Sequence, residues 1–441
     1  MLNQRFCQYF QEKFFENDDE NFQKFLNTIE KPILRTIRIK PGKEKVVRER
    51  LEQDGWILNP TEIPRMYQMD RRADFNPLER RLGMTMDHLV GNFYIQELAA
   101  AHPVNLLADG RIHHEEFLIL DMASSPGGKT TQLAEYFPNS FIVANEPSRE
   151  RIPQLLQNLE RMHTPNVAIT LYPGQQWRHF HEIFDRILLD APCSGEGTLY
   201  KGTDAVKNWH IKSIRQIANL QKKLIVSALT ALKVGGEMVY STCALNDLEN
   251  EGILAYISEK YGEKIEVIFQ KKFWPHIDQT GGFFMAKIVK KASIIDDIAS
   301  EKLKNFNAEI KKFSKKFGNF SLRDGITNFS HRDKILAVKN AHIVVPFLEK
   351  MYFMRLGETI GFWENNQFFP NARAYRDLQI ENFSKISLQN EKELDFYLRG
   401  GMLECDEDGY FLIQYANETL SLENAKNGII ENTFPKDWLR R

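Results

Sequence analysis

Cysteine is scarce in this sequence of 441 residues, which contains only Cys7, Cys193, Cys243 and Cys405. They lie far apart and no two of them form a CxxC pair, so the sequence suggests neither a zinc site nor a disulfide framework. A run of 18 apolar residues, the length that a membrane-spanning helix needs, is also lacking. The N-terminus has no apolar segment of the secretory type. We therefore expect a cytoplasmic protein that does not bind membranes.

An excess of charge of either sign is lacking too, since the formal net charge is −1. Such a balance gives no overall attraction to a polyanion, so any nucleic acid must be held by local basic surface. Residues 31–50 hold eight Lys or Arg against two Glu. This run is either a solvated face or a contact for nucleic acid, and the composition leaves both open. The hydrophobic share of 42% excludes disorder of the whole chain.

The middle of the chain, residues 117–290, alternates short apolar segments with helical patterns. This alternation predicts an α/β domain with a largely parallel sheet, helices on both faces, and ligands at the carboxyl ends of the strands. The expected strands are residues 117–121, 141–143, 167–170, 186–190, 237–241 and 283–289, and the expected helices are residues 129–136, 149–162, 211–232 and 250–261.

The flanks differ from this middle part. Phenylalanines spaced by three and four within residues 1–30 predict an amphipathic helix, and residues 33–39 read as a strand. Residues 294–316 are rich in lysine and are expected to form a helical link between domains. Beyond them, short segments rich in glycine, asparagine and aromatic residues predict a small β-rich region.

The first expected strand of the middle part leads into residues 121–130, DMASSPGGKT. A phosphate-binding Walker loop would need glycine five positions before Gly128, where Ala123 stands, and the dinucleotide pattern GxGxxG is absent. The loop therefore favours binding of a methyl-donor cofactor, and a P-loop NTPase is the distant alternative. The next strand ends at Glu146, and a carboxylate at that place can accept hydrogen bonds from both ribose hydroxyls of a nucleoside.

Two cysteines follow neighbouring strands at the same edge of the expected sheet. Cys193 lies in DAPCSGEG, residues 190–197, and Cys243 lies in STCA, residues 241–244. A single buried cysteine is usually only a small apolar residue, but two at adjacent strand ends favour an active-site pair. Such a pair suits methylation at carbon 5 of cytosine, which needs a thiolate to add to carbon 6 first. Asp190 is placed to interact with the ring nitrogen, and the second thiol can assist product release.

Several motifs resemble those of the Nol/Nop/Sun family of RNA cytosine-5 methyltransferases. They are DAPCSG at 190–195 and STC at 241–243 after PGGKT at 126–130, together with YIQE at 94–97, KNW at 207–209 and ENE at 249–251. They occur in the family's order, span residues 90–255 and are highly specific in combination. The resemblance implies a Rossmann-like domain that uses S-adenosylmethionine.

The resemblance also implies roles for single residues. Cys243 is the expected nucleophile and Cys193 the cysteine needed for release, while Asp190 touches both base and cofactor. Many relatives have an acidic residue after the third strand, but this chain reads LYPGQ at 171–175, so adenine recognition is expected from the backbone near Gly174 or from Gln175. Lys201 is a candidate for RNA contact. The expected cofactor-binding residues are Ala123, Ser124, Ser125, Pro126, Gly127, Gly128, Lys129, Glu146, Arg151, Gly174 and Asp190.

The flanking segments resemble those of family members that act on small-subunit rRNA. In IRIK, residues 37–40, Lys40 replaces the family's usual asparagine, and Glu431 replaces a usual lysine. Segments RLG at 355–357, YLRG at 397–400 and NTFP at 432–435 resemble C-terminal pre-PUA and PUA-like RNA-binding modules. The expected division is an N-terminal RNA-binding extension at 1–92, the catalytic domain at 93–293, a linker and pre-PUA module at 294–382, and a PUA-like domain at 383–441.

The expected function is therefore methylation of a cytosine in 16S rRNA, free or within a 30S particle or its precursor, by a monomeric enzyme. Transfer RNA is the alternative substrate within the same chemistry. A catalytically silent RNA-binding assembly factor is the alternative of another class, and intact Cys193, Cys243 and Asp190 argue against it. The spacing of these residues does not by itself exclude DNA, and in either case the target base must be unpaired or flipped to reach a pocket.

Overall fold

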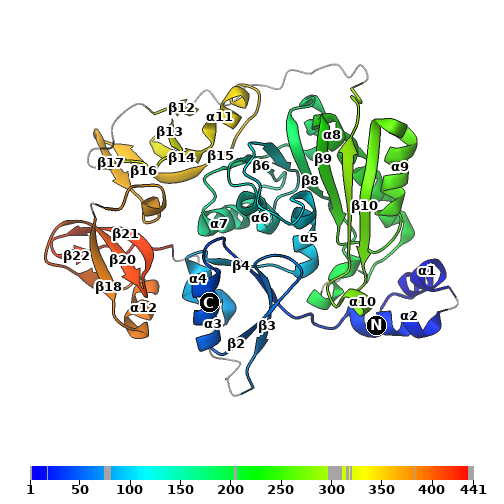
Figure 1. Ribbon diagram of the computed structural model, residues 1–441, viewed down its shortest axis with the longest axis horizontal. Coiled ribbons are helices and arrows are strands. Elements are labelled where there is room, and N and C mark those ends of the chain that lie inside the picture. Colours follow the sequence, from blue (N-terminus) through cyan, green and yellow to red (C-terminus); the bar gives the residue numbers. More distant parts are fainter. Residues whose placement is uncertain are drawn as a thin grey trace.

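The fold of the chain was analysed in a computed structural model that describes residues 2–16, 18–73, 81–202, 206–295, 310–313, 317, 320–381 and 383–435. These residues form four β-sheets with helices packed around them (Figure 1). No helix in these ranges is both long enough and apolar enough to span a bilayer.

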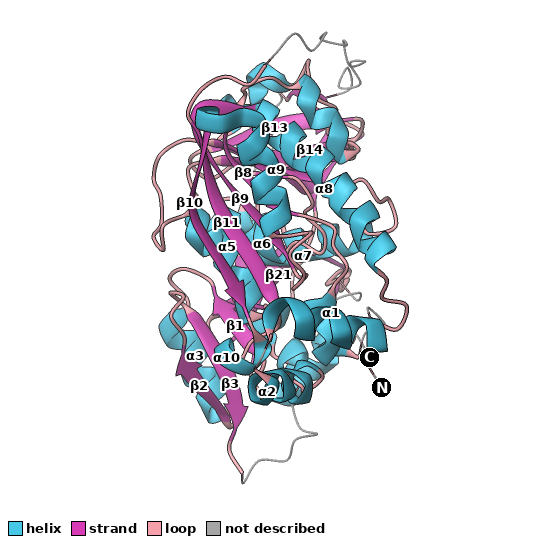
Figure 2. Cartoon of the chain, turned by 90° about the vertical axis from the view of Figure 1, so that its right-hand side faces the viewer, coloured by secondary structure: helices cyan, strands magenta, loops and turns pink. Residues whose placement is uncertain are grey.

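The central sheet has eight strands in the order β10-β11-β9-β8-β5-β6-β7-β15 (Figure 1). The five strands from β9 to β7 in this order are parallel. At one edge β11 pairs antiparallel with β9, and β10 pairs antiparallel with β11 (Figure 2). At the other edge β15 pairs antiparallel with β7. The expected α/β class with a largely parallel sheet is confirmed. The strands are β5 (Leu118–Asp121), β6 (Phe141–Asn145), β7 (Val167–Thr170), β8 (Phe184–Asp190), β9 (Leu232–Thr242), β10 (Ile265–Phe273), β11 (Phe283–Lys290) and β15 (Arg355–Leu356).

Helices cover both faces of this sheet because its central strands are apolar on both sides. Strand β5 is buried along its whole length, as expected of a strand with helices on either face. Ile119 joins the hydrophobic core on the side of α5 (Leu98–Leu107), α6 (Gly128–Tyr136) and α7 (Ile152–Met162). Leu118 and Leu120 join the core on the opposite side, beneath α8 (Ile211–Ala231) and α9 (Glu251–Tyr261).

The N-terminal 30 residues form two helices, α1 (Gln4–Phe14) and α2 (Asp19–Ile29), in agreement with the expected helical pattern. Their phenylalanines pack against Trp209, Leu245 and Trp274 of the catalytic part. The following residues build a separate four-stranded sheet in the order β2-β3-β1-β4. Its elements are β1 (Thr36–Ile39), α3 (Glu44–Gln53), β2 (Trp56–Pro60), β3 (Met66–Arg71), α4 (Met86–Leu89) and β4 (Phe93–Ile95).

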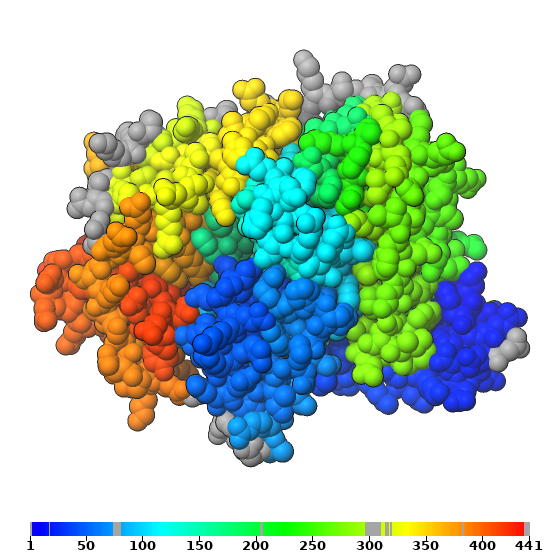
Figure 3. All heavy atoms as spheres, in the orientation of Figure 1, coloured from blue at the N-terminus to red at the C-terminus, as the bar shows by residue number. Residues whose placement is uncertain are grey.

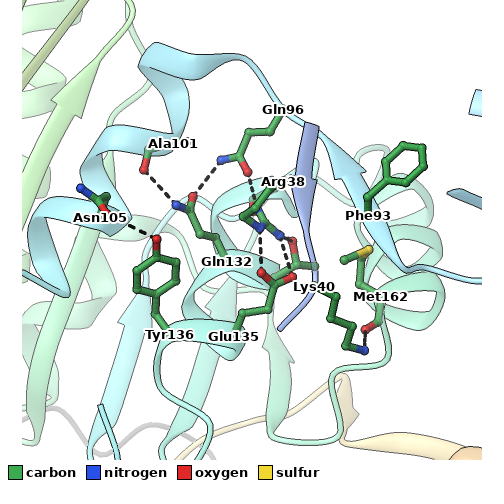
Figure 4. Close-up of polar contacts among 12 residues, drawn as sticks. Arg38, Lys40, Phe93, Gln96, Ala101, Asn105, Gln132, Glu135, Tyr136 and Met162 are labelled. Carbon is green, nitrogen blue, oxygen red and sulfur yellow. Dashed lines mark hydrogen bonds and ion pairs between the residues drawn. The ribbon is translucent and has the colours of Figure 1, made fainter. Parts of the chain in front are cut away.

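A buried ion pair joins this N-terminal sheet to the catalytic part (Figure 4). The fully buried Arg38 of β1 donates from Nε and Nη2 to the carboxylate of Glu135 on α6, at 2.9 and 3.1 Å. It also donates to the hydroxyl of Thr131 at 2.9 Å and to the backbone carbonyl of Gly128 at 3.1 Å. Gln96 accepts a further hydrogen bond from Arg38. The network therefore fixes the first turns of α6, which follow directly from the DMASSPGGKT loop.

Lys40, the residue that departs from the family pattern, has a structural contact. Its buried ammonium donates to the backbone carbonyl of Met162 at the end of α7, at 2.8 Å (Figure 4). Burial and the nearby guanidinium of Arg376 lower the pKa of Lys40 to about 8, since both disfavour the charged form.

Substitution of Arg38 by methionine is expected to destabilise the fold by about 3–5 kcal/mol, because it leaves the buried carboxylate of Glu135 without its counter-charge. Urea denaturation measures the change. Arg399→Met is the matched control: Arg399 pairs with Asp395 at the surface, and an exposed pair contributes little to stability. Equal losses in the two variants would contradict a structural role for the Arg38 network.

Two further sheets follow in the C-terminal part, which confirms the expected β-rich region. The first has the order β12-β13-β14-β16-β17 and the second the order β18-β20-β21-β22-β19. Their elements are β12 (Ile310–Lys312), β13 (Ile326–His331), β14 (Lys334–Lys339), α11 (Ala341–Val344), β16 (Glu358–Glu364), β17 (Gln367–Pro370), β18 (Ser384–Leu388), α12 (Glu391–Leu398), β19 (Leu403–Glu404), β20 (Gly409–Tyr415), β21 (Glu418–Lys426) and β22 (Ile429–Ile430).

The expected helix at 294–316 is wrong within the part of that segment that the structure describes. Most of the expected helix at 294–316 lies outside the described residues, but residues 310–312 form strand β12 and not a helix. Strand β12 pairs with β13 in antiparallel register, and Ile310 packs against the main hydrophobic core. Pairing with a distant strand thus overrides the local helical preference of a lysine-rich segment.

The C-terminal part lies against the N-terminal sheet, far from it in sequence (Figure 3). Lys43 forms an ion pair with Glu418 at 2.9 Å, and Arg50 donates to the backbone carbonyl of Ala416 at 2.7 Å. Leu89 and Val90 share a hydrophobic cluster with residues of the last sheet. The two ends of the chain therefore contact each other as well as the central sheet.

Candidate active site

The loops that follow β5, β6, β8 and β9 meet at the carboxyl edge of the central sheet, as expected for ligand sites in this class of fold. A cavity of about 430 Å³ opens there. One wall comes from β4 and the residues just after it, with Tyr94 and Glu97. The predicted site residues that line the cavity are Ala123, Ser124, Ser125, Pro126, Gly128, Lys129, Arg151, Asp190, Lys201 and Cys243.

Five predicted residues lie outside this lining, among them the adenine candidate Gln175, which is partly exposed. Gly127 precedes α6 with φ at +104°, a conformation that favours glycine. Glu146 directly follows the neighbouring strand β6. Gly174 is packed inside the protein, where a Cβ would lie 2.5 Å from Cδ2 of Leu224. Cys193 does not line the cavity, but its Sγ contacts that of Cys243.

The two cysteines are in direct contact, with their Sγ atoms 2.8 Å apart. The hydrogen bond with Cys243, together with burial, raises the pKa of the Cys193 thiol well above its usual value. Cys193 therefore keeps its proton, and Cys243 is the sulfur that faces the cavity. The sequence identified this pair correctly as neighbours; Cys7 and Cys405 belong to other hydrophobic clusters.

Asp190 is held in a fixed orientation at the end of β8. Its Oδ2 accepts a hydrogen bond from Nζ of Lys129 at 2.7 Å, and its Oδ1 accepts one from the hydroxyl of Ser241 at 2.8 Å. Burial alone would lower the pKa of Lys129, but the carboxylates of Asp190 and Asp121 outweigh it and the pKa is raised. Lys129 is thus a charged ammonium beside the Asp190 carboxylate in the cavity wall.

Hydrogen bonds of its own side chains hold the DMASSPGGKT loop in place. Oδ2 of Asp121 accepts a hydrogen bond from the Thr130 hydroxyl at 2.6 Å, and burial raises the pKa of Asp121 to about 7. Ser124 donates to the backbone carbonyl of Asn145 at 2.9 Å, which ties the loop to β6. A side chain at position 128 would meet the Tyr94 ring at 3.2 Å, so glycine permits this close approach.

Glu146 and Arg151 connect the second strand end to the same loop. The nearly buried Glu146 lies 3.1 Å from Nη1 of Arg151 and accepts a hydrogen bond from the backbone N–H of Ser148 at 2.9 Å. Nη2 of Arg151 donates to the backbone carbonyl of Ser125 at 2.6 Å. The site thus combines the cavity-lining loop with the carboxylate of Glu146 and the guanidinium of Arg151. These are the polar groups that an amino-acid nucleoside such as S-adenosylmethionine needs.

Two buried glutamates, for which the sequence predicted no role, tie the cysteine loops together. Glu196 accepts from the backbone N–H groups of Leu245 and Asn246, each at 2.9 Å, and from the indole of Trp209 at 2.5 Å. Glu249 accepts from the backbone N–H of Ser194 at 3.0 Å and from Gln221 at 2.8 Å. Each carboxylate starts in one cysteine loop and binds backbone of the other. The only sequence signal was their presence within the GEG and ENE motifs.

Comparison with known proteins identifies the family. A family model described as 16S rRNA methyltransferase RsmB/F matches residues 111–289. Ribosomal RNA small subunit methyltransferase F of Shewanella piezotolerans is 32% identical over 94% of this chain and 93% of its own length. This chain belongs to the RsmB/F family. The Vibrio cholerae relative of the same name is 30% identical over 96% of this chain and 95% of its own. The family resemblance drawn from the motifs is thus confirmed.

Solved structures share the fold of this chain. The methyltransferase homolog protein from Pyrococcus horikoshii is 26% identical, with a TM-score of 0.54 over 62% of this chain and 91% of that one. NSun6 from the same organism, solved with SFG, has a TM-score of 0.57 over 66% of this chain and 99% of that one; at 22% identity it supports the fold alone. As an RsmB/F member, the chain is an S-adenosylmethionine-dependent rRNA methyltransferase, which sets aside the P-loop NTPase alternative.

Proposed function

We propose that this chain methylates carbon 5 of one cytosine in 16S rRNA, with Cys243 as nucleophile and Cys193 as the residue for release. The observation that supports this most is the cysteine pair: Cys243 and Asp190 both line the cavity, and the Cys193 sulfur lies 2.8 Å from the Cys243 sulfur. Family membership supports the rRNA substrate, because the full-length relatives carry that name.

In the first half of the reaction the Cys243 thiolate adds to carbon 6, and the electron pair of the carbon 5–carbon 6 double bond is delocalised from carbon 5 toward ring nitrogen 3. The Lys129–Asp190 pair, joined at 2.7 Å, supplies positive charge and a transferable proton next to ring nitrogen 3. Carbon 5 is then nucleophilic. S-adenosylmethionine supplies the methyl group.

In the second half the proton on carbon 5 leaves to solvent, the carbon 5–carbon 6 double bond re-forms, and the Cys243 sulfur departs. Cys193 is placed to assist because its thiol keeps its proton and contacts that sulfur. Donating the proton to the departing sulfur makes it a better leaving group. The two cysteines thus have different tasks because Cys243 lines the cavity and Cys193 contacts its sulfur.

We further propose that residues 123–129, Glu146, Arg151, Gly174 and Asp190 bind the cofactor. The cavity lining supports the loop residues, Arg151 and Asp190. Glu146 directly follows β6, which pairs with β5, and Gly174 lies shortly after β7, which pairs with β6. Their places after the carboxyl ends of these strands support a role in cofactor binding. We expect Glu146 to serve the ribose and the Gly174 region the adenine.

The flanking modules complete the proposal. We infer that residues 1–92 and the PUA-like residues 383–441 bind RNA, that residues 294–382 connect them as linker and pre-PUA module, and that Lys201 contacts RNA at the cavity. We further propose that the protein acts as a monomer in the cytoplasm, on free rRNA or on a 30S particle.

Bisulfite sequencing of total RNA from cells with and without the gene tests the proposal. We expect one 16S rRNA cytosine to resist conversion only when the gene is present, and to be converted when a Cys243→Ala copy replaces it. Protection of a tRNA cytosine instead would show that the alternative substrate is correct. No change in any RNA would identify the chain as a catalytically silent assembly factor.

A further inference from the structure

A second cavity, of about 440 Å³, lies on the other side of two residues that line the first. Tyr94 and Ile95 of β4 belong to the walls of both cavities. We call the second one the Arg161 cavity. Three arginines line it, Arg35, Arg81 and Arg161, and among the residues that the structure describes no aspartate or glutamate lines it. The first cavity, by contrast, contains Glu97 and Asp190.

Arg161, at the end of α7, is a buried cation that has only neutral partners. Its side chain donates to the backbone carbonyls of His88 at 2.9 Å and Phe93 at 3.3 Å, and to the side-chain oxygen of Asn158 at 3.2 Å. Within the described ranges, neither Arg161 nor Arg35 nor Arg81 forms an ion pair with a carboxylate. Arg38, equally buried, has Glu135. Burial without a counter-charge is costly, and it lowers the pKa of Arg161 to about 10.

The rest of the lining indicates what kind of anion fits. Gln154, Gln157 and Asn158 follow the same face of α7 as Arg161, so one wall consists of amide groups. Met84 lines the cavity and is 53% exposed, and Leu34, next to Arg35 in the chain, is 52% exposed. Arginines and amides suit a phosphate group, while exposed apolar side chains suit the face of a base. A nucleotide unit offers both.

We propose that the Arg161 cavity binds a phosphodiester of the rRNA strand, close in sequence to the target cytosine, while the target base occupies the cavity on the other side of Tyr94. The proposal rests on the proposed function, because it takes the first cavity as the place of the target base. Tyr94, between the two cavities and within cation–π distance of both Arg38 and Arg161, then separates the target base from its neighbour along the strand.

Synthetic RNA with single uncharged linkages tests this directly. In a set of oligonucleotides carrying the target cytosine, each neighbouring phosphodiester is replaced in turn by a methylphosphonate, and binding is measured without S-adenosylmethionine. We expect one linkage whose neutralisation weakens wild-type binding about tenfold, the loss of one charge-assisted contact. The same replacement should have almost no effect on Arg161→Gln or Arg35→Gln. Arg178→Gln, an exposed arginine in the segment Gly174–His179, should behave as wild type.

Several outcomes would overturn the proposal. One is a set of linkages that affect wild type and the Arg161→Gln and Arg35→Gln variants equally. Another is binding of inorganic phosphate that Arg161→Gln abolishes while the linkage pattern stays unchanged, which would make the cavity a site for free anions. Thermal melting checks that Arg161→Gln is folded, and the exposed Arg35→Gln gives an independent reading. Adduct formation by Cys193→Ala on unmodified RNA is scored in parallel, so failure of the proposed function is seen separately.

Discussion

Cys193→Ala should leave the protein covalently joined to its RNA, whereas Cys243→Ala should form no adduct and no product. Without Cys193 the attack by Cys243 and the methyl transfer still proceed, but the elimination loses the thiol that contacts the departing sulfur. Removal of one proton-transferring group typically slows its step by about 10²–10⁴-fold, enough for the adduct to accumulate. Cys243→Ala removes the nucleophile itself, so turnover should fall below detection.

A denaturing gel with labelled RNA measures the adduct, and incorporation of labelled methyl groups measures turnover. Cys7→Ala and Cys405→Ala are matched controls, since these thiols are free and lie in other parts of the fold. Both should turn over like the wild type. Normal turnover by Cys193→Ala, or an adduct in Cys243→Ala, would show that the roles of the two cysteines are wrongly assigned.

Glu196→Ala should have the second largest effect, on stability and activity together. The fully buried carboxylate accepts hydrogen bonds from Trp209, Leu245 and Asn246, and the alanine variant leaves these donors unsatisfied. Breaking a buried charged network costs about 3–5 kcal/mol. Because the lost bonds hold the Cys243 loop against the Cys193 loop, we also expect methylation to be lost under conditions in which the variant is still folded.

Urea denaturation and a methylation assay at low temperature separate the two effects. Glu20→Ala is the control, because Glu20 is exposed and pairs with Lys24 one turn away, a contact that contributes little to stability. Glu196→Gln should fall between wild type and alanine, since its single carbonyl oxygen satisfies part of the donor set. A folded Glu196→Ala variant with full activity would contradict the bracing role.

The sequence was most informative where local pattern and chemistry coincide. Strands β5 to β9 are apolar runs that end in polar loops, so their order and the meeting of Asp190, Cys193 and Cys243 at one edge could be predicted. Strand β10 was missed. Its apolar stretch at 265–269 is interrupted by Glu266, does not alternate and is followed by QKK, so the sequence does not mark a strand; in the fold, Ile268 and Phe269 are exposed.

Contacts between distant segments could not be predicted because they leave no local pattern. Arg38 was visible only as part of a basic run, and its pairing with Glu135 depends on how the N-terminal sheet docks on α6. Arg161 looked like an ordinary helix residue, and only the fold shows it buried beside a cavity. Likewise, Gly174 was chosen from its place after β7, but the fold packs it against Leu224 and Met122.

Strand β15 has a practical consequence for the design of fragments. It comes from the C-terminal part, yet it pairs with β7 at the edge of the central sheet, where the backbone N–H groups of Met354 and Gly357 bond to carbonyls of Ile169 and Val167. A fragment that stops after the last strand of the catalytic domain would expose this edge, and exposed edges invite pairing with other molecules. A fragment that ends before β15 is therefore expected to aggregate more readily than one that includes it.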